Sequence, residues 1–380
     1  MRRAKWPASS STPVVTPLQP SVVYASRDPD ALDASYDGRE PGYTYARETH
    51  PNAEVLAGLI DELEGASGGI VVGSGMAAIT IALLGVLKAG DHVIGADQLY
   101  GRSLRMMNEE LPRLGIETSL VDATDARAVE AALKPTTKLI LIETLSNPTL
   151  RMSDVTGILA LRERGVMVAV DNTFTTPLML KPLEMGADIT IHSVTKLLAG
   201  HSDATLGYVA AKDAELNARF ADLAATMGVT ASPFDCWLGE RGLYSFDMRF
   251  ERASATAKRL ADALADSGKV SKVLYPTRPD HPDHNKATQL LAGKGGNMVS
   301  FEIAGGRGEA NQLVQRLENI AFAPTLGDIR TTLSHPPSSS HRAMDEQARQ
   351  NLGISEGFFR VSVGCENADQ LIDAFLEALA

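Results

Sequence analysis

Apolar residues along the chain form short continuous runs and helical repeats. Residues 166–170 are all apolar, which predicts a strand covered on both faces, as in a parallel sheet. Residues 187–192 alternate and are rich in β-branched side chains, which predicts a second strand. Apolar positions at helical spacing over 52–63, followed by Gly65, predict an amphipathic helix. Further strands are expected at 92–94, 117–121 and 138–143.

Helical segments separate these strands, and this alternation predicts an α/β fold with a mostly parallel sheet and helices on both faces. A chain of 380 residues is expected to form two domains of unequal size. We place the larger domain at 50–240 and a smaller α/β domain at 241–380. The smaller domain is expected to contain helices at 249–267 and 368–379 and strands at 272–275, 297–303 and 358–363.

Residues 1–49 are rich in Pro, Ser, Asp and Tyr and show little periodicity. Such an arm is either disordered or packed on another surface, often a second subunit. Its segment 42–47 contains Tyr45 and Arg47, which suit an ordered contact, although a solvated arginine and a loop-packing tyrosine are the simpler interpretation.

Charge and cysteine content indicate which classes of binding partner and which cellular compartment are favoured. There are 36 Lys and Arg residues against 47 Asp and Glu, a net charge of −11, which disfavours nucleic acid and anionic membranes as partners. The two cysteines, Cys236 and Cys365, are far apart and match no metal or disulfide spacing. No run approaches the roughly 18 apolar residues of a membrane-spanning helix. We therefore expect a soluble protein of the reducing cytoplasm.

Lys196 is the first candidate for chemistry. It follows the strand at 187–192 closely and is surrounded by small hydroxyl and apolar residues. Such surroundings penalise the ammonium, lower its pKa and make the amine a competent Schiff-base nucleophile. Ser193 and Thr195 add hydroxyls that could hold a phosphate. A lysine near a strand end more often points into water, so this stretch alone is only suggestive.

Asp171, taken together with Lys196, points to a specific cofactor. It ends the buried strand at 166–170, and ligands of open α/β sheets lie beyond the carboxyl ends of strands. An aspartate there is often only a helix N-cap. However, pyridoxal phosphate needs both a lysine for the imine and a carboxylate that faces its ring nitrogen. Asp171 and Lys196 fit these two roles.

A glycine-rich turn precedes a helix expected to run to Leu87. Backbone N–H groups at such a turn can bind phosphate. The pattern Gly73-x-Gly75-x-x-Ala78 also matches a dinucleotide site loosely, and Asp97 could contact a ribose. An NAD(P)-dependent oxidoreductase is therefore an alternative. It is disfavoured because the turn follows a helix rather than a first strand and because it leaves Asp171 and Lys196 unexplained.

Motifs along nearly the whole chain resemble the Cys/Met-metabolism family of pyridoxal-phosphate enzymes. This family includes cystathionine β- and γ-lyases, cystathionine γ-synthase, methionine γ-lyase and homoserine sulfhydrylases. Single motifs are weak, but the ordered set at these spacings is highly specific. The motifs are Tyr45-Ala-Arg47, Gly73-Ser-Gly75-Met76, Asp97-Gln-Leu-Tyr100-Gly101, Glu143 to Pro148, Asp171-Asn-Thr, Ser193-Val-Thr195-Lys196, Gly200-His-Ser-Asp203, Ser232 to Trp237, Arg241-Gly-Leu243 and Phe359-Arg360-Val-Ser-Val-Gly364.

The resemblance implies a type I pyridoxal-phosphate transferase fold and a set of cofactor contacts. It implies that Lys196 binds the cofactor covalently and is the general base, and that Asp171 pairs with the pyridine nitrogen. Tyr100 would stack on the ring. The phosphate would be held by Gly75 and Met76 amides together with Ser193 and Thr195.

The resemblance also implies an assembly and a substrate site. Tyr45 and Arg47 would reach the phosphate of the neighbouring subunit, so that active sites form at a dimer interface within a homotetramer, a dimer of dimers. The substrate would be an amino acid, its carboxylate bound by Arg360 with help from Asn147 and Thr325. Besides Lys196, either Tyr45 or Tyr100 could serve as a catalytic acid for the leaving sulfur.

The resemblance favours a carbon–sulfur lyase that eliminates at Cβ or Cγ of a sulfur amino acid such as cystathionine or methionine. The alternative within the family is γ-replacement, as in an O-acylhomoserine sulfhydrylase or cystathionine γ-synthase. Two departures bear on the substrate. Pro324 stands where cystathionine-processing γ-enzymes tend to carry Glu. Arg102 could bind an acidic tail, although pairing with a nearby carboxylate is the safer interpretation. No metal site is expected, and His281 and His284 are interpreted as structural.

Overall fold

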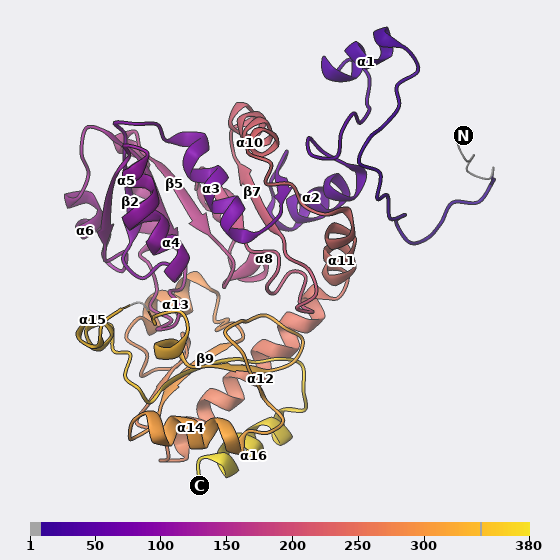
Figure 1. Cartoon of the computed structure of the whole chain (residues 1–380). Helices are drawn as coiled ribbons and strands as arrows, with labels where there is room; N and C mark the ends of the chain where they lie inside the picture. The colour runs from indigo at the N-terminus through magenta and orange to yellow at the C-terminus, as the bar shows by residue number, and fades with distance from the viewer. Residues whose placement is uncertain (1–8, 343) are drawn as a thin grey trace.

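The computed structural model describes residues 9–342 and 344–380, so the first eight residues of the expected arm lie outside the described part. Two sheets dominate the chain (Figure 1). The larger has seven strands in the order β1-β7-β6-β5-β4-β2-β3, and the smaller has five in the order β10-β11-β12-β9-β8. The predicted α/β class, with a large mostly parallel sheet and a smaller second sheet, is confirmed.

The large sheet is parallel except around β7. β3, β2, β4, β5 and β6 pair in parallel, whereas β7 runs antiparallel to both β6 and β1. Its strands are β1 (Ile70–Val72), β2 (His92–Ala96), β3 (Glu117–Val121), β4 (Thr137–Glu143), β5 (Met167–Asp171), β6 (Ile189–His192) and β7 (Gly207–Ala211). β1 and β7 were not predicted. The turn at Gly73 therefore does follow a strand, contrary to our expectation.

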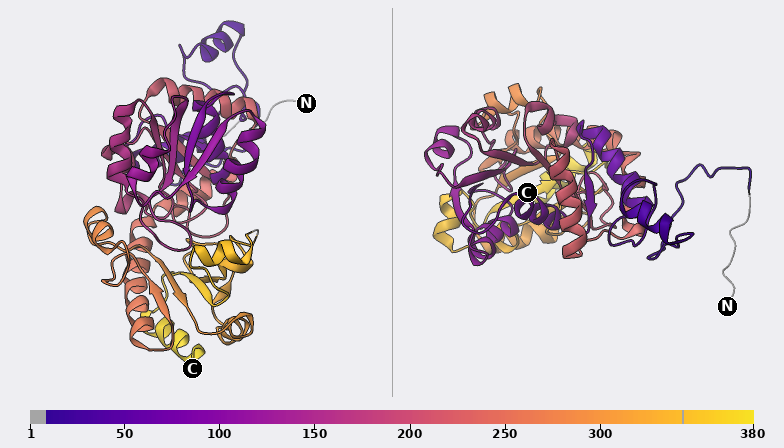
Figure 2. Two further views of the ribbon diagram at one scale, coloured as in Figure 1. Left: turned by 90° about the vertical axis from the view of Figure 1, so that its left-hand side faces the viewer. Right: turned by 90° about the horizontal axis from the view of Figure 1, so that it is seen from above.

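Helices cover both faces of the large sheet, as the turned views in Figure 2 show. Among them, α2 begins with Pro51 and ends at the left-handed Gly65, as predicted. The helices are α2 (Pro51–Glu64), α3 (Gly75–Val86), α4 (Gly101–Arg105), α5 (Leu111–Arg113), α6 (Ala126–Ala131), α7 (Val155–Ala160), α8 (Thr176–Met179), α9 (Pro182–Met185), α10 (Ala214–Met227) and α11 (Pro233–Leu243), with a π-helical turn at Met106–Glu110 and a 3₁₀ turn at Leu161–Arg164.

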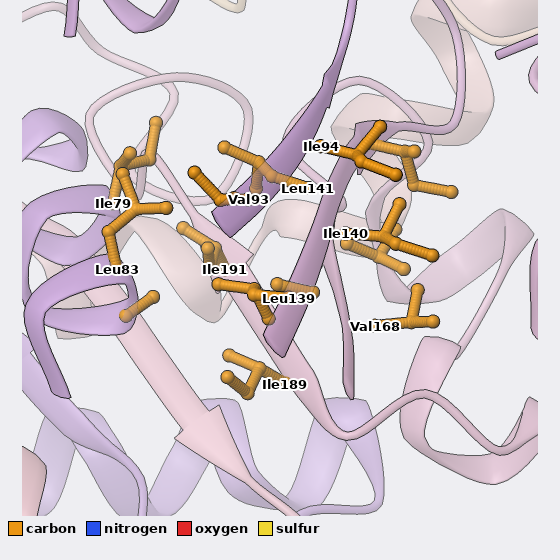
Figure 3. Close-up of a cluster of buried hydrophobic side chains, with 14 of the residues drawn as sticks. Ile79, Leu83, Val93, Ile94, Leu139, Ile140, Leu141, Val168, Ile189 and Ile191 are labelled. Carbon is orange, nitrogen blue, oxygen red and sulfur yellow. The ribbon is translucent and has the colours of Figure 1, made fainter. Parts of the chain in front are cut away.

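The core of this part lies between α3 and the central strands (Figure 3). Ile79 and Leu83 of α3 lie in one cluster with side chains from six strands, four of which contribute the residues labelled in Figure 3. Each fully buried aliphatic side chain stabilises the fold by about 1.5–3 kcal/mol relative to exposure. The strand side chains in Figure 3 are Val93, Ile94, Leu139, Ile140, Leu141, Val168, Ile189 and Ile191. This packing fixes the carboxyl ends of β4, β5 and β6 relative to one another.

The smaller sheet packs on α12 and α16, which enclose a second core containing Phe301, Phe359 and Phe375. The strands are β8 (Lys272–Leu274), β9 (Met298–Glu302), β10 (Ala321–Phe322), β11 (Thr332–Ser334) and β12 (Phe358–Ser362). The helices are α12 (Phe246–Asp266), α13 (His284–Leu290), α14 (Arg307–Arg316), α15 (Glu346–Asn351) and α16 (Ala368–Ala378), with a 3₁₀ turn at Pro336–Ser338. The predicted elements are present; β10, β11, α13, α14 and α15 were not predicted.

The N-terminal arm projects away from both sheets (Figures 1 and 2). From residue 9 onward it contains one helix, α1 (Pro29–Tyr36), in a segment that we expected to be irregular. Close to the body, the Trp237 indole donates to the Thr16 carbonyl at 2.9 Å and the Gln19 N–H donates to Asn52 Oδ1 at 3.0 Å. Val14 and Val23 of the arm are exposed. Within residues 9–342 and 344–380, no helix combines the length and apolarity needed to cross a bilayer.

Candidate active site

Lys196 lies in a tight turn just after β6. Its N–H donates to the Ser193 carbonyl at 3.0 Å, and its carbonyl accepts from the Gly200 N–H at 2.8 Å. Among the described residues, the side-chain amine makes one hydrogen bond, to Thr325 Oγ1 at 3.4 Å. Burial, and then the nearby charge of Arg360, lower the pKa of Lys196. The sequence-based prediction of a desolvated, reactive lysine at this position is consistent with this geometry.

Arg249 of α12 holds the backbone that follows Lys196. Its buried guanidinium donates to the carbonyls of Leu197, Leu198 and Gly242 at 3.0, 3.0 and 2.9 Å. Helix α12 is thereby tied to the turn that carries the lysine. Sequence reasoning did not identify this residue, because an arginine within a helical repeat gives no sign of its distant partners.

Arg360 lies in the middle of β12 and is only 5% exposed. Nη1 donates to Asn147 Oδ1 at 2.5 Å and Nη2 donates to the Thr325 carbonyl at 2.9 Å. Nε is buried and has no partner among the described residues. Burial lowers the pKa of Arg360 to about 10, so the group is still a cation at neutral pH. A buried cation without a paired carboxylate and with a free donor is suited to bind an anionic ligand.

Asp171 ends β5, on the strand next to β6. Its Oδ1 accepts from the Thr173 N–H at 3.0 Å and from the Thr173 hydroxyl at 2.5 Å. Burial raises the pKa of Asp171, while the hydrogen bonds from Thr173 and the nearby His192 lower it. The structure thus places the predicted carboxylate and the predicted lysine at the ends of adjacent strands.

The start of α3 lies close to the turn that precedes Lys196. Ser74 caps the helix by accepting from the Ala77 N–H at 3.1 Å, which leaves the amides of the first turn directed outward. A β-carbon on Gly75 would lie 2.6 Å from the Ser193 β-carbon, so the start of α3 lies directly against Ser193. The first turn of α3, with the amides of Gly75 and Met76, therefore lies beside Ser193, an arrangement suited to bind an anion.

Thr195 was predicted to hold a phosphate, but its hydroxyl is hydrogen-bonded to the backbone of Leu206. Its hydroxyl donates to the Leu206 carbonyl at 3.1 Å and accepts from the Leu206 N–H at 2.8 Å. A hydroxyl has one hydrogen to donate. Donation from Thr195 to a phosphate would therefore have to replace its bond to the Leu206 carbonyl.

Tyr100 caps α4, and its backbone N–H donates to Glu143 Oε1 at 2.6 Å. Its side chain is exposed, and it is close enough to Arg360 to influence that guanidinium. Arg102, two residues further on, is also exposed. In the part of the chain that the structure describes, no ion pair involves Arg102, so the expected carboxylate partner is not found. Pro324 is exposed beside Thr325.

Tyr45 and Arg47 do not join this site within one chain. Arg47 donates to the Ala225 carbonyl of α10 at 2.8 Å, and its guanidinium lies 5.5 Å from the centre of the Tyr45 ring. Both residues belong to the last part of the arm in the sequence. Their predicted role therefore depends on a second copy of the chain.

The residues described here fit pyridoxal phosphate. The desolvated lysine, the carboxylate on the adjacent strand and the amides at the start of α3 match the aldehyde, ring nitrogen and phosphate of that cofactor. Among residues 9–342 and 344–380, no group of three or more His, Cys, Asp or Glu side chains is arranged to hold a metal ion. Glu143 and Thr173 also touch predicted site residues, and sequence reasoning assigned them no role. Glu143 ends a strong predicted strand, so the reasoning applied to Asp171 could have identified it.

Comparisons with known proteins agree with this geometry. The profile of the family described as Cys/Met metabolism PLP-dependent enzyme matches residues 3–380. A cystathionine beta-lyase of Bacillus subtilis is 41% identical over 342 residues, covering 89% of this chain and 86% of the relative. An L-methionine gamma-lyase of Pseudomonas putida is 34% identical over 368 residues, covering 96% and 92%.

Solved structures share the whole fold. The cystathionine gamma synthase of Xanthomonas oryzae pv. oryzae, determined in complex with cystathionine, superposes with a TM-score of 0.90 at 35% identity. The match covers 96% of this chain and 92% of that one. The architecture is therefore shared along nearly the full length of both chains, including the smaller sheet.

Proposed function

The chain belongs to the Cys/Met-metabolism family of pyridoxal-phosphate-dependent enzymes, and from this membership we propose that it is a carbon–sulfur lyase that eliminates at Cβ or Cγ of a sulfur amino acid. The enzyme uses pyridoxal phosphate, and the nicotinamide alternative is set aside. The lyase assignment is supported by relatives named cystathionine beta-lyase and L-methionine gamma-lyase.

The observation that carries this proposal is the buried guanidinium of Arg360 beside the Lys196 turn. Thr325 links the two residues, because its hydroxyl accepts from Lys196 Nζ and its carbonyl accepts from Arg360 Nη2. Arg360 Nε remains free to donate. An α-amino acid whose carboxylate binds Arg360 would present its Cα near the Lys196 amine. Asn147 and Thr325 hold the guanidinium in place for this purpose.

The cofactor contacts proposed for this chain follow the same geometry. Lys196 would carry the cofactor, and Asp171 would face its ring nitrogen. Tyr100 would lie over the ring, where its exposed side chain can stack on a flat ligand. The phosphate would be held by a group of backbone amides and hydroxyls, namely Gly75, Met76, Ser193 and, after exchange of its Leu206 bond, Thr195.

The bound cofactor supplies an electron sink for the negative charge that develops at Cα. The protein supplies the proton transfers. The Lys196 amine would take the proton from Cα, and burial, which lowers its pKa, favours the neutral amine that can act as this base. Tyr100 would give a proton to the departing sulfur, and Tyr45 of a second copy is the other candidate for this role.

Assembly completes the site in this proposal. Tyr45 and Arg47 belong to the last residues of an arm, residues 9–49 of the described part, that projects from the body of its own chain. In a dimer they would reach the phosphate site of the neighbouring subunit, and two dimers would form a homotetramer. We place the enzyme in the cytoplasm, where free thiols such as those of Cys236 and Cys365 stay reduced.

The test is the product formed from each candidate substrate by the purified holoenzyme. L-cystathionine, L-methionine and O-acylhomoserines are incubated with and without an added thiol, and keto acids and thioethers are quantified. With cystathionine, β-elimination yields pyruvate, homocysteine and ammonia, whereas γ-elimination yields 2-oxobutyrate, cysteine and ammonia. Lys196→Ala should abolish either product, while Lys138→Ala, which changes an exposed lysine of β4, should not.

γ-Replacement is the alternative that this experiment can reveal. It is favoured by the match to a cystathionine gamma synthase over nearly the full chain. If a thioether accumulates only when an O-acylhomoserine and a thiol are both present, and keto acid stays at background, the lyase proposal is wrong and the enzyme is a synthase.

A further inference from the structure

Glu143 and Asp171 lie directly opposite each other at the ends of β4 and β5. They are Cα partners in the parallel pairing of these strands. Partners at the same level of neighbouring strands direct their side chains to the same face of the sheet, at roughly the 4.8 Å spacing of the strands. Two carboxyl groups therefore stand side by side at the edge of the sheet that carries the active site.

The two carboxyl groups have unequal support. Asp171 Oδ1 accepts two hydrogen bonds from Thr173, whereas the structure gives Glu143 one, from the Tyr100 N–H. Within residues 9–342 and 344–380, neither carboxyl takes part in an ion pair with Lys, Arg or His. Two desolvated carboxyl groups on neighbouring strands disfavour a second negative charge, so one group keeps the proton.

The proton belongs on Glu143. Burial, and then the charge of Asp171, raise the pKa of Glu143 well above its usual value, and the Tyr100 N–H offsets only part of this. For Asp171, the bonds from Thr173 and the nearby His192 counteract the effect of burial. Adjacent carboxyls whose surroundings push their proton affinities apart divide into an acid and a carboxylate.

We propose that Glu143 is a neutral positioning acid, which anchors the backbone of Tyr100 and leaves Asp171 as the single negative charge at this edge of the sheet. This inference rests on the proposed cofactor roles of Asp171 and Tyr100. It adds that Glu143 links these two residues. Its hydrogen bond from the Tyr100 N–H fixes the backbone that carries the stacking ring. Its neutral state leaves Asp171, which would face the ring nitrogen, without a second negative charge beside it.

A small cavity beside Glu143 can hold a hydrogen-bond acceptor for the acid O–H. The cavity has room for about one water molecule, the minimum for a bridging partner. Besides Glu143, its lining includes the oxygen acceptors of Asp97, Gln98, Asp122 and Ser146, and the guanidinium of Arg151, which is paired with Asp283. A water there can accept from the protonated carboxyl and donate to these oxygens. Both oxygens of the neutral carboxyl then have a hydrogen-bond partner. One accepts from the Tyr100 N–H, and the other donates to the water in the cavity.

Glu143→Gln and Glu143→Ala in the holoenzyme test this inference. Gln reproduces a neutral acid, with one acceptor for the Tyr100 N–H and one donor toward the cavity. We expect Glu143→Gln to keep the cofactor absorbance, its pH dependence and kcat/KM within about threefold of the parent. Glu143→Ala removes the anchor of Tyr100 and should lower cofactor affinity and kcat/KM by about tenfold or more.

Infrared spectroscopy measures the protonation state directly. The parent holoenzyme at neutral pH should show a carboxylic-acid C=O band that Glu143→Gln removes and Glu117→Gln, a change at an exposed acid of β3, leaves in place. If no such band is lost, or if Glu143→Gln shifts the pH dependence of the cofactor absorbance by a unit or more, Glu143 is ionised and the inference is overturned. These readouts need no turnover, so they stand apart from the product assay that tests the lyase proposal.

Discussion

Gly327 lies directly against the backbone of Lys196. A β-carbon on Gly327 would be 2.7 Å from the Lys196 carbonyl carbon and 2.6 Å from the Leu197 nitrogen, and Gly327 has a φ of +82°. Only glycine adopts this conformation at low cost and permits this approach. The loop that carries Thr325 can therefore reach the lysine only because position 327 has no side chain.

We predict that Gly327→Ala separates this loop from the lysine turn. The added methyl must displace backbone atoms, and the left-handed conformation is itself strained, so the free energy of unfolding should fall by about 1–3 kcal/mol. Activity should fall more than tenfold, because the displaced atoms belong to the reactive lysine. Gly308→Ala is the control, since a β-carbon there meets nothing within 4 Å in an exposed helix. Equal activity of the two variants would refute the close approach.

Arg360 should be replaceable by lysine only at a large loss of substrate binding. Lysine keeps the charge but cannot hold Asn147 and the Thr325 carbonyl while also presenting a planar pair of donors to a carboxylate. We expect Arg360→Lys to raise KM about 10–100-fold with a smaller change in kcat. Arg259→Lys, in an exposed pair with Asp369, should leave both parameters unchanged. An unaltered KM in Arg360→Lys would show that the substrate carboxylate binds elsewhere.

The reactivity of Lys196 should depend on the charge of Arg360. Burial comes first and Arg360 second among the causes that lower the pKa of Lys196. Removing the guanidinium charge in Arg360→Gln stabilises the ammonium, so the pKa of the lysine should rise. The apoenzyme of this variant should therefore form the borohydride-reducible adduct with pyridoxal phosphate at a higher pH midpoint than the parent. A midpoint that stays in place or moves to lower pH would exclude this electrostatic coupling.

Much of the fold could be predicted because the central strands have distinctive patterns. The apolar run that forms β5 and the β-branched run that forms β6 identified the sheet ends where Asp171 and Lys196 lie. β1 was missed because it has three residues between glycine-rich turns. β7 (Gly207–Ala211) was missed because small residues such as Ala210 and Ala211 suit a strand or a helix equally, and only antiparallel pairing with β6 decides between them.

The site was predictable where a residue follows a strand end and unpredictable where the partner is distant. Glu143 follows the same rule as Asp171, yet its link to Tyr100 appears only when β4 is placed beside α4. Gly327 and Arg249 both contact the backbone at or just after Lys196, although they lie far from it in the sequence. No local pattern marks such contacts, because they arise from how the smaller sheet and α12 pack against the lysine turn.

Two buried histidines should make the protein sensitive to mild acid. Burial lowers the pKa of both His281 and His341 to about 4, against about 6.5 in an unfolded chain. Between these values the unfolded state binds more protons than the folded state. Stability is therefore fully present above about pH 6.5 and falls as pH decreases toward 4, by up to about 1.4 kcal/mol per pH unit for each group.

Denaturant titrations of the holoenzyme between pH 7 and 5 can resolve this effect before most carboxylates titrate. The slope of unfolding free energy against pH gives the number of protons taken up on unfolding. Either His281→Gln or His341→Gln should lower this number by up to one. The double variant should lower it by the sum of the two single effects. For His341, charges on Arg360 and Arg349 add to the effect of burial. A slope that neither variant alters would mean that these rings titrate alike in the folded and unfolded states.

Arg249 offers a test of how far the lysine turn depends on α12. Its guanidinium has three backbone carbonyls as partners and also donates to Ser245 Oγ at 3.1 Å. Arg249→Met keeps most of the side-chain volume but leaves these buried acceptors without their donor. We expect a loss of about 2–4 kcal/mol in unfolding free energy, measured by denaturant titration.

The matched control is Arg252→Met, one turn further along α12. Arg252 is exposed and donates to the Glu366 carbonyl at 3.2 Å, so its loss should cost about 0.5 kcal/mol or less. The two variants also separate stability from positioning. Because two of the three carbonyls belong to the residues directly after Lys196, Arg249→Met should weaken cofactor retention under native conditions, and Arg249→Lys should restore part of it. If retention stays at the parental level while stability falls, Arg249 supports the fold without holding the lysine turn in place.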